Sequence, residues 1–110
     1  MRQITALQLD QWLKDSVAGI RVKPQLLDVR EPWELEVCRI PDTKSMPMRS
    51  VPARYLELNR DLETVVICHH GVRSYQVALF LEHQGFAEIV NLQGGVAAWA
   101  QQVDPGMPVY

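Results

Sequence analysis

Cysteine is scarce in this sequence. Cys38 and Cys68 are the only two among 110 residues, and no CxxC pair occurs. Two isolated cysteines form no disulfide framework, and such sparse use is typical of a reducing cytoplasm. The absence of a CxxC pair argues against a thioredoxin-type redox site and against a structural zinc knuckle. We therefore expect a cytoplasmic protein with free thiols.

Long hydrophobic runs and basic runs are also lacking. No apolar stretch approaches the length of a membrane span, and residues 1–5 contain no apolar segment typical of a signal peptide. The formal net charge is -2, and Lys and Arg are scattered without interleaved aromatic residues. These absences disfavour a membrane or nucleic-acid partner.

The remaining composition is that of an ordinary globular domain. Hydrophobic residues make up 47% of the chain and charged residues 22%, both in the usual range. A chain of 110 residues is long enough to bury one core without disulfides. No segment repeats, and none is of low complexity. We predict a single domain over residues 1–110.

Short apolar segments alternate with helical segments along the whole chain. We expect strands at 25–29, 64–67 and 89–92, and weaker ones at Ile4 and 45–48. We expect helices at 7–15 behind a Thr5 cap, at 32–36, from a Ser50 cap to Leu58, at 74–84 and from 95 to near 101. This alternation predicts an α/β fold of three layers, with a central parallel sheet of about five short strands and helices on both faces.

The segment from Val65 to Ser74 is the most informative part of the sequence. A β-branched run ends at Cys68, a short polar loop with Gly71 follows, and an amphipathic helix is predicted to begin at Ser74. Backbone N–H groups and the positive end of the helix dipole converge at such a position, which favours the thiolate. Because ligands bind at the carboxyl ends of parallel strands, we expect Cys68 to share a crevice with residues 28–30.

Five motifs in order resemble the single-domain form of the rhodanese family of sulfurtransferases. They are Leu27-Asp28-Val29-Arg30-Glu31 with Trp33-Glu34, Ile40-Pro41, Cys68-His69-His70-Gly71-Val72-Arg73-Ser74, Gly85-Phe86, and Asn91-Leu92-Gln93-Gly94-Gly95-Val96-Ala97-Ala98-Trp99. The resemblance spans Ile4 to Trp99. It departs at Cys38-Arg39 and Asp42-Thr43, where the family usually carries Gly-His and Gly-Ala.

The resemblance implies a transferase that moves a sulfane sulfur from thiosulfate or a related donor to cyanide or a thiol through a persulfide. Cys68 is then the nucleophile. The loop that cradles the persulfide anion with backbone N–H groups is His69, His70, Gly71, Val72, Arg73 and Ser74. No cofactor is expected. The expected partners are a small-molecule donor and acceptor, or a protein in either role.

Several side chains of the loop have more than one open interpretation. Arg73 either binds an anionic donor or favours the thiolate by proximity, and the alternative is a solvated arginine. Ser74 either donates to the sulfur or caps the helix. We expect no metal site at His69 and His70, because three consecutive residues seldom converge on one ion. One ring is expected to shape donor access while the other packs against a neighbouring loop.

Supporting roles are predicted for Asp28 and Arg30. A carboxylate beside the thiolate would oppose its ionisation, so Asp28 is expected to accept hydrogen bonds from loop N–H groups or to pair with Arg30. Glu31 and Glu34 are expected to form the solvated face of a short helix.

The other notable side chains are assigned to the core. Cys38 is expected to be a partly buried small apolar residue rather than a resolving thiol. Trp12, Trp33 and Trp99 are expected to be core anchors.

Three rival functions are weighed against sulfur transfer. Cell-cycle dual-specificity phosphatases share the fold but have a cysteine loop one residue longer, which makes room for a tetrahedral phosphate. Four residues separate Cys68 from Arg73, so the tighter loop disfavours a phosphatase. A non-enzymatic binding module typically lacks the cysteine that this chain keeps. A persulfide relay has the same loop chemistry with different partners, and it stays open.

Overall fold

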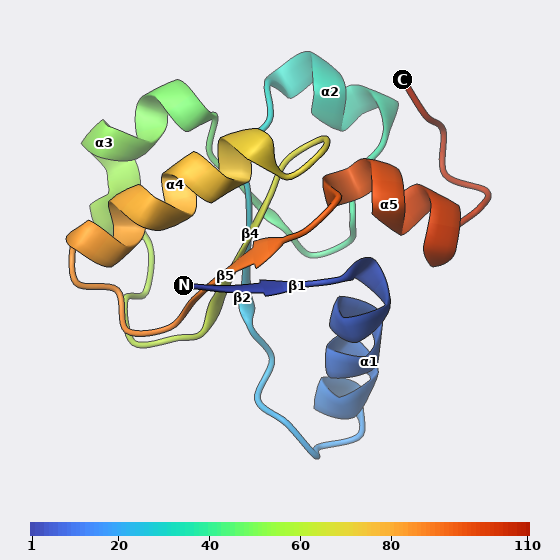
Figure 1. The fold of residues 1–110 in the computed structure, drawn as a ribbon, viewed down its shortest axis with the longest axis horizontal. Coiled ribbons are helices and arrows are strands. Elements are labelled where there is room, and N and C mark those ends of the chain that lie inside the picture. The colour runs from blue at the N-terminus through green and yellow to red at the C-terminus, as the bar shows by residue number, and fades with distance from the viewer.

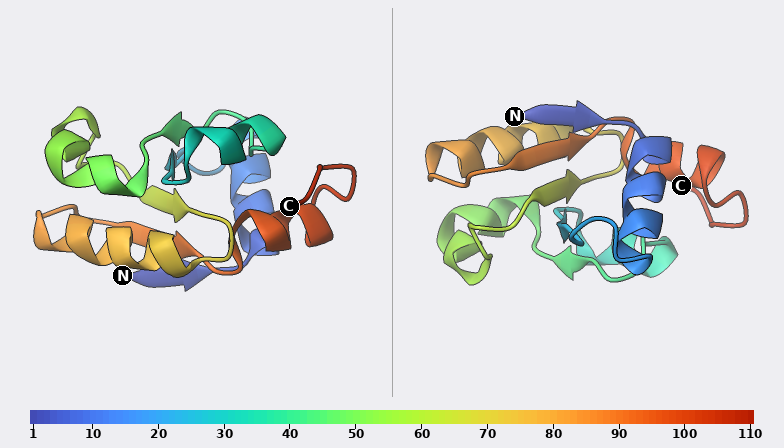
Figure 2. Two further views of the ribbon diagram at one scale, coloured as in Figure 1. Left: turned by 90° about the horizontal axis from the view of Figure 1, so that it is seen from above. Right: turned by 90° about the horizontal axis from the view of Figure 1, so that it is seen from below.

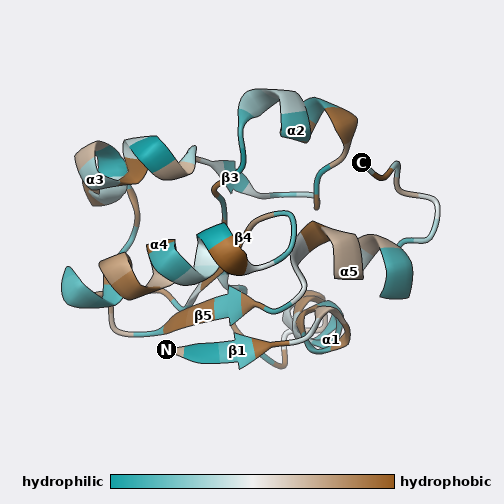
Figure 3. Ribbon diagram, turned by 45° about the horizontal axis from the view of Figure 1, so that its top comes forward, coloured by the Kyte–Doolittle hydropathy of each residue, from teal (hydrophilic) through white to brown (hydrophobic).

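Five short parallel strands form one sheet in the order β1-β5-β4-β2-β3 in the computed structural model, which describes residues 1–110 (Figure 1). Their bounds are β1 (Arg2–Ile4), β2 (Gln25–Asp28), β3 (Lys44–Ser45), β4 (Thr64–Ile67) and β5 (Ile89–Leu92). β4 is entirely buried at the centre, whereas β1 is an edge strand that is mostly hydrophilic (Figure 3). The predicted parallel α/β sheet is confirmed.

Helices cover both faces of the sheet. α1 (Ala6–Val17) and α5 (Gly95–Gln102) lie on one side, and α3 (Val51–Arg54) and α4 (Val72–His83) lie on the other (Figure 2). α2 (Pro32–Val37) follows β2, and short 3-10 turns at 48–50 and 55–57 flank α3. None of these helices combines the length and the apolar character needed to cross a membrane.

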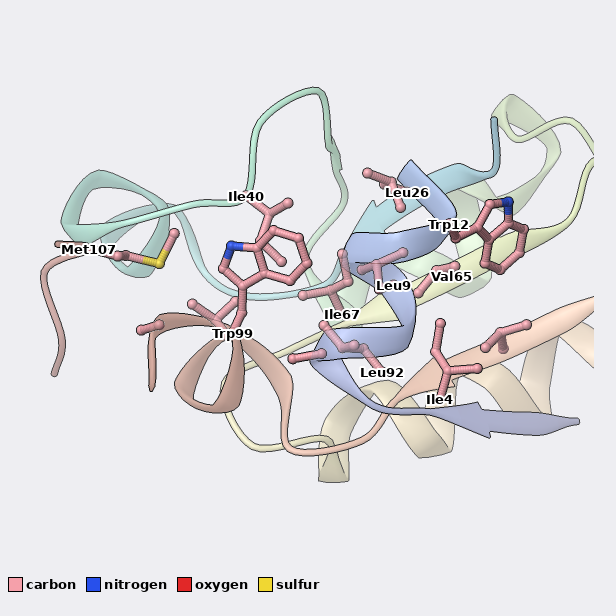
Figure 4. Packing of buried hydrophobic residues seen from close by; sticks show 14 of the residues in the cluster. Ile4, Leu9, Trp12, Leu26, Ile40, Val65, Ile67, Leu92, Trp99 and Met107 are labelled. Atoms are coloured by element: carbon pink, nitrogen blue, oxygen red, sulfur yellow. The ribbon is translucent and has the colours of Figure 1, made fainter. Parts of the chain in front are cut away.

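Two hydrophobic cores lie on opposite faces of the sheet, because successive strand side chains point in opposite directions. On β4, Val65 and Ile67 belong to the core under α1 and α5, while Val66 belongs to the core under α3 and α4. Figure 4 shows the first core, in which Leu9 and Trp99 approach the strands from the two helices. Cys68 continues the alternation of β4 and joins the second core.

Two predicted helices differ from the structure, one in its start and the other in its continuity and its cap. α4 begins at Val72 instead of Ser74, because Gly71 adopts a left-handed conformation with φ 97° and serves as the N-cap. The predicted helix after Ser50 is broken into α3 and a 3-10 turn. Ser50 does not cap it with its side chain, because the hydroxyl donates to the Pro47 carbonyl.

One of the three predicted tryptophan anchors is also wrong. Trp12 and Trp99 are buried, but Trp33 is 59% exposed. Trp33 lies in the first turn of α2 and belongs to neither core, and its ring packs edge-on against Tyr110 with centroids 5.5 Å apart. Trp33 is therefore a surface residue near the carboxyl ends of the strands.

Candidate active site

Cys68 follows the last residue of β4 and is 1% exposed. Its Sγ accepts a hydrogen bond from the Gly71 N–H at 3.0 Å, and its thiol donates to the Ser74 hydroxyl at 3.3 Å. The segment 69–71 therefore curves around the sulfur, and the first turn of α4 closes the loop. Of the loop amides expected to cradle the sulfur, Gly71 supplies the one that donates to Sγ.

The N-terminus of α5 holds the outer side of this loop. The N–H of Val96 donates to the Cys68 carbonyl at 2.9 Å, and that of Ala97 donates to the His69 carbonyl at 3.0 Å. With these carbonyls turned toward α5, the loop is fixed in the curved conformation that brings the Gly71 N–H to the sulfur. The sequence motif includes Gly94-Gly95 but does not predict this anchoring.

Gly95 allows the cysteine loop and the N-terminus of α5 to lie this close together. A Cβ at this position would lie 2.3 Å from the Cys68 carbonyl oxygen and 2.5 Å from that of His69. Its φ of 58° is also in the left-handed region that glycine adopts without strain. Both features show why the loop and α5 meet at a glycine.

Asn91 is a buried polar residue of β5 that lies beside the loop. Its Oδ1 accepts a hydrogen bond from the Ser74 hydroxyl, and its Nδ2 donates to the Gly71 carbonyl at 3.1 Å and to Gln3 Oε1 at 3.0 Å. Asn91 is not among the residues that the sequence predicts for the site. The available signal was an amide within the apolar run of a central strand, where a polar group needs partners.

Arg73 is paired rather than free. Its guanidinium donates two hydrogen bonds of 2.8 Å to the two carboxylate oxygens of Glu34. The hydrogen bonds from Arg73 outweigh burial and lower the pKa of Glu34 to about 2. The same hydrogen bonds raise the pKa of Arg73 above its ordinary value. The expectation that Glu34 is solvated is wrong: it is 3% exposed because α2 turns it toward α4.

Asp28 and Arg30 form a second, fully buried ion pair at the carboxyl end of β2. β2 and β4 are neighbours in the sheet, so this pair lies next to the strand that carries Cys68. Arg30 donates to both carboxylate oxygens of Asp28, and Asp28 Oδ1 also accepts from the Arg30 N–H. Burial opposes the charge of Arg30, but the hydrogen bonds to Asp28 and Tyr110 raise its pKa. Of the two alternatives for Asp28, the structure shows pairing with Arg30.

Tyr110 connects the two ion pairs. Its hydroxyl accepts from Arg30 at 2.9 Å and donates to Glu34 Oε1 at 2.8 Å. Burial raises the pKa of Tyr110 to about 12, so the hydroxyl keeps its proton at neutral pH. This link joins the C-terminal segment to α2 and thereby to Arg73, and the sequence motifs do not include it.

The two histidines of the loop lie in an aromatic stack. The ring of His69 lies between those of Tyr110 and His70, with centroids 3.9 Å and 4.0 Å away. Burial lowers the pKa of His69, and the neighbouring charge of His70 lowers it further. His69 thus packs against the C-terminal segment, while His70 is exposed.

A small cavity of about 100 Å³ opens beside this stack. Its lining includes His69, His70, Tyr110 and Cys38. Cys38 is 8% exposed and belongs to the first core, as expected of a small apolar residue. No three histidine, cysteine or acidic side chains come together as a metal-binding group.

The comparison with protein families decides the classification. The model of the family described as "Rhodanese-like domain" matches residues 9–102, most of the chain. This chain belongs to the rhodanese family. The rhodanese domain is 39% identical over 84 residues to a sulfurtransferase of Allochromatium vinosum, covering 76% of each chain. It is also 39% identical over 80 residues to the putative sulfurtransferase YtwF of Bacillus subtilis, covering 73% of this chain and 77% of that one.

Solved structures of rhodanese domains have the same fold. A rhodanese-related protein from Thermoplasma volcanium superposes with a TM-score of 0.81 at 33% identity, covering 100% of this chain and 98% of that one. The family match and the relatives named as sulfurtransferases support sulfur transfer as the general activity of this rhodanese domain.

Proposed function

We propose that this protein transfers a sulfane sulfur from thiosulfate or a related donor to cyanide or a thiol, through a persulfide on Cys68. The observation that carries the proposal is the position of Cys68 Sγ. It lies inside a closed loop, 3.0 Å from the Gly71 N–H and 3.3 Å from the Ser74 hydroxyl. A backbone N–H directed at a sulfur, as that of Gly71 is here, stabilises the anionic thiolate and persulfide that the transfer requires.

The proposed reaction has two balanced steps. The Cys68 thiol first loses its proton to solvent, and the thiolate attacks the sulfane sulfur of thiosulfate. The new Cys68 S–S bond forms as the S–S bond of thiosulfate breaks, and sulfite leaves with the bonding electron pair. Cyanide or a thiolate then attacks the terminal sulfur of the persulfide and releases the Cys68 thiolate, so no external oxidant or reductant is consumed.

The other predicted residues act around this sulfur in the proposal. The backbone of residues 69–74 shapes the cradle, with Gly71 as its direct donor in the thiol state. Asp28 and Arg30 form no hydrogen bond to the Cys68 thiol, and they support the site by holding β2, Cys38 and Tyr110 together. Arg73, neutralised by Glu34, positions the first turn of α4.

The test is the intact mass of the protein after incubation with thiosulfate and removal of excess donor. We expect a gain of one sulfur atom, which cyanide removes as thiocyanate. Cys68→Ser is expected to lose both the adduct and thiocyanate formation. An adduct or turnover that survives in Cys68→Ser contradicts the proposal.

Cys38→Ser is the matched control, since it removes the other thiol of the chain. Because Cys38 is buried in the first core, this variant is expected to load and transfer sulfur like the parent protein. Loss of loading in Cys38→Ser, with the fold intact, would instead assign Cys38 to the reaction.

A persulfide relay is the second candidate. It is favoured by exposed apolar side chains on the loop side of the molecule, where Trp33, Val72 and Val109 are 59%, 68% and 74% exposed. A relative in Bacillus subtilis, 37% identical over 79 residues, is named a putative sulfur carrier protein, and this chain covers 43% of it. A Cys68 persulfide that cyanide and small thiols discharge slowly would favour the relay over a small-molecule transferase.

A further inference from the structure

Asn91 occupies a position where an apolar residue would be expected. It lies in β5 between Val90 and Leu92, is 1% exposed, and pairs in register with Gln3 of β1 and Val66 of β4. Burying an amide is costly unless its polar atoms are bonded. All of the polar atoms of this side chain are bonded, so the cost is offset by specific partners.

The orientation of the Asn91 amide is set by its two donors. One N–H of Nδ2 is used by the Gly71 carbonyl and the other by Gln3 Oε1. Turning the amide over would place its oxygen against the Gly71 carbonyl oxygen, which can only accept, and would lose that hydrogen bond. Oδ1 must therefore face Ser74, as observed.

This orientation determines what Ser74 does with its single proton. A hydroxyl has one O–H donor and two acceptor lone pairs. The Ser74 O–H donates to Asn91 Oδ1, and its oxygen accepts from the Cys68 thiol at 3.3 Å. In this arrangement Ser74 supports the neutral thiol and has no proton to offer a thiolate.

We propose that Asn91 is a positioning residue that holds the Ser74 hydroxyl proton away from Cys68 and so limits the thiolate population. The inference deepens the proposed function, because it rests on Cys68 being the reactive thiol. On ionisation, the Cys68 proton passes to solvent and the Ser74 O–H rotates from Asn91 Oδ1 to Sγ. The Gly71 N–H keeps its bond to sulfur, and Asn91 Oδ1 loses its donor. The lost bond opposes ionisation.

The test measures the pH dependence of Cys68 alkylation by iodoacetamide, read by mass, in a Cys38→Ser background so that one thiol reacts. Asn91→Leu removes the amide while keeping a side chain of similar size. It frees the Ser74 proton for the thiolate, so we expect the midpoint of the alkylation profile to fall by about one pH unit, a tenfold change in ionisation. Asn91→Ala, expected to shift the midpoint in the same direction, replaces it if the leucine variant does not fold.

Asn91→Leu is then combined with Ser74→Ala. Asn91→Leu also removes the anchor of the Gly71 carbonyl, and that effect is present with or without the Ser74 hydroxyl. The proposal requires the midpoint to shift when Ser74 is present and the shift to vanish when Asn91→Leu is combined with Ser74→Ala. A shift of equal size in both backgrounds, no shift in either, or a rise in midpoint overturns it.

Thr64→Val is the matched control. Thr64 is a buried polar residue of the neighbouring strand, and it donates to the Leu62 carbonyl at the opposite end of the sheet from Cys68. Loss of the Thr64 hydroxyl is expected to lower the free energy of unfolding while leaving the midpoint of Cys68 alkylation unchanged. Alkylation needs no sulfur donor, so the result stands whether or not thiosulfate loads Cys68.

Discussion

The Arg73 guanidinium and the Glu34 carboxylate meet through two hydrogen bonds of 2.8 Å, joining the first turn of α4 to α2. The arginine that closes the cysteine loop is therefore already neutralised from outside the loop. An anion that approached Arg73 would therefore meet an ion pair instead of a free cation. The pair also restrains the helix whose first turn lies beside Cys68 Sγ, so Glu34 supports the structure around this sulfur.

Replacing Glu34 by Gln should weaken this support. The change removes the charge that Arg73 pairs with but keeps the shape of the side chain. We expect the free energy of unfolding in urea to fall by about 1–2 kcal/mol, below the value for a fully buried pair because Arg73 stays partly solvated. Glu57→Gln, which breaks the exposed Arg54–Glu57 pair, is the control and should leave the urea midpoint unchanged. Equal effects of the two substitutions would contradict the supporting role.

The same carboxyl predicts how stability depends on pH. Arg73 lowers the pKa of Glu34 from 4.5 to about 2 in the folded protein. Above pH 4.5 both the folded and the unfolded states hold the carboxylate, and the stabilisation is complete. As the pH falls from 4.5 toward 2, the unfolded state takes up the proton first, so the free energy of unfolding decreases. Urea unfolding at several acidic pH values should show a shallower decrease in Glu34→Gln than in the parent.

Tyr110 should contribute separately through its hydroxyl and its ring. Tyr110→Phe removes the bonds to Arg30 and Glu34 and is expected to cost about 1 kcal/mol of unfolding free energy. It keeps the stack on His69, so the pKa of His69 stays lowered by burial.

Tyr110→Ala also uncovers the His69 ring, and the pKa of His69 should rise toward its ordinary value. NMR titration of the His69 ring protons measures this, with Tyr110→Phe, which keeps the stack, as the control. A His69 curve unchanged in Tyr110→Ala would show that the stack does not bury the ring in solution.

Gly95→Ala should destabilise the protein more than Gly19→Ala, although both glycines have a left-handed backbone conformation. Gly19 and Gly95 both have positive φ, 77° and 58°, but a Cβ at Gly19 meets nothing within 4 Å. Gly19→Ala is expected to cost about 1 kcal/mol from backbone strain alone. Gly95→Ala adds the overlap with the Cys68 and His69 carbonyls, so it should cost more and slow sulfur loading of Cys68. Similar urea midpoints for the two variants would contradict this account.

Local patterns in the sequence predicted most of the fold. The apolar run before Cys68 matches β4, the run at 89–92 matches β5, and Thr5 caps α1 as expected. These signals succeed because strand and helix periodicity and capping depend on neighbours within a few residues. The start of α4 was missed because a left-handed glycine can replace a side-chain cap, and a sequence does not show which conformation Gly71 adopts.

The proposed nucleophile Cys68 and its loop can be predicted from the sequence, since the strand end, the glycine and the following helix are contiguous. The hydrogen-bonded pairs around this loop cannot be predicted from the sequence in the same way. Glu34 and Arg73 are 39 residues apart, Ser74 and Asn91 are 17 apart, and Arg30 and Tyr110 are 80 apart. Each pair meets because parallel strands and their covering helices bring distant segments to one edge of the sheet. A hydrogen bond depends on a separation of about 3 Å, which packing sets and the order of residues does not.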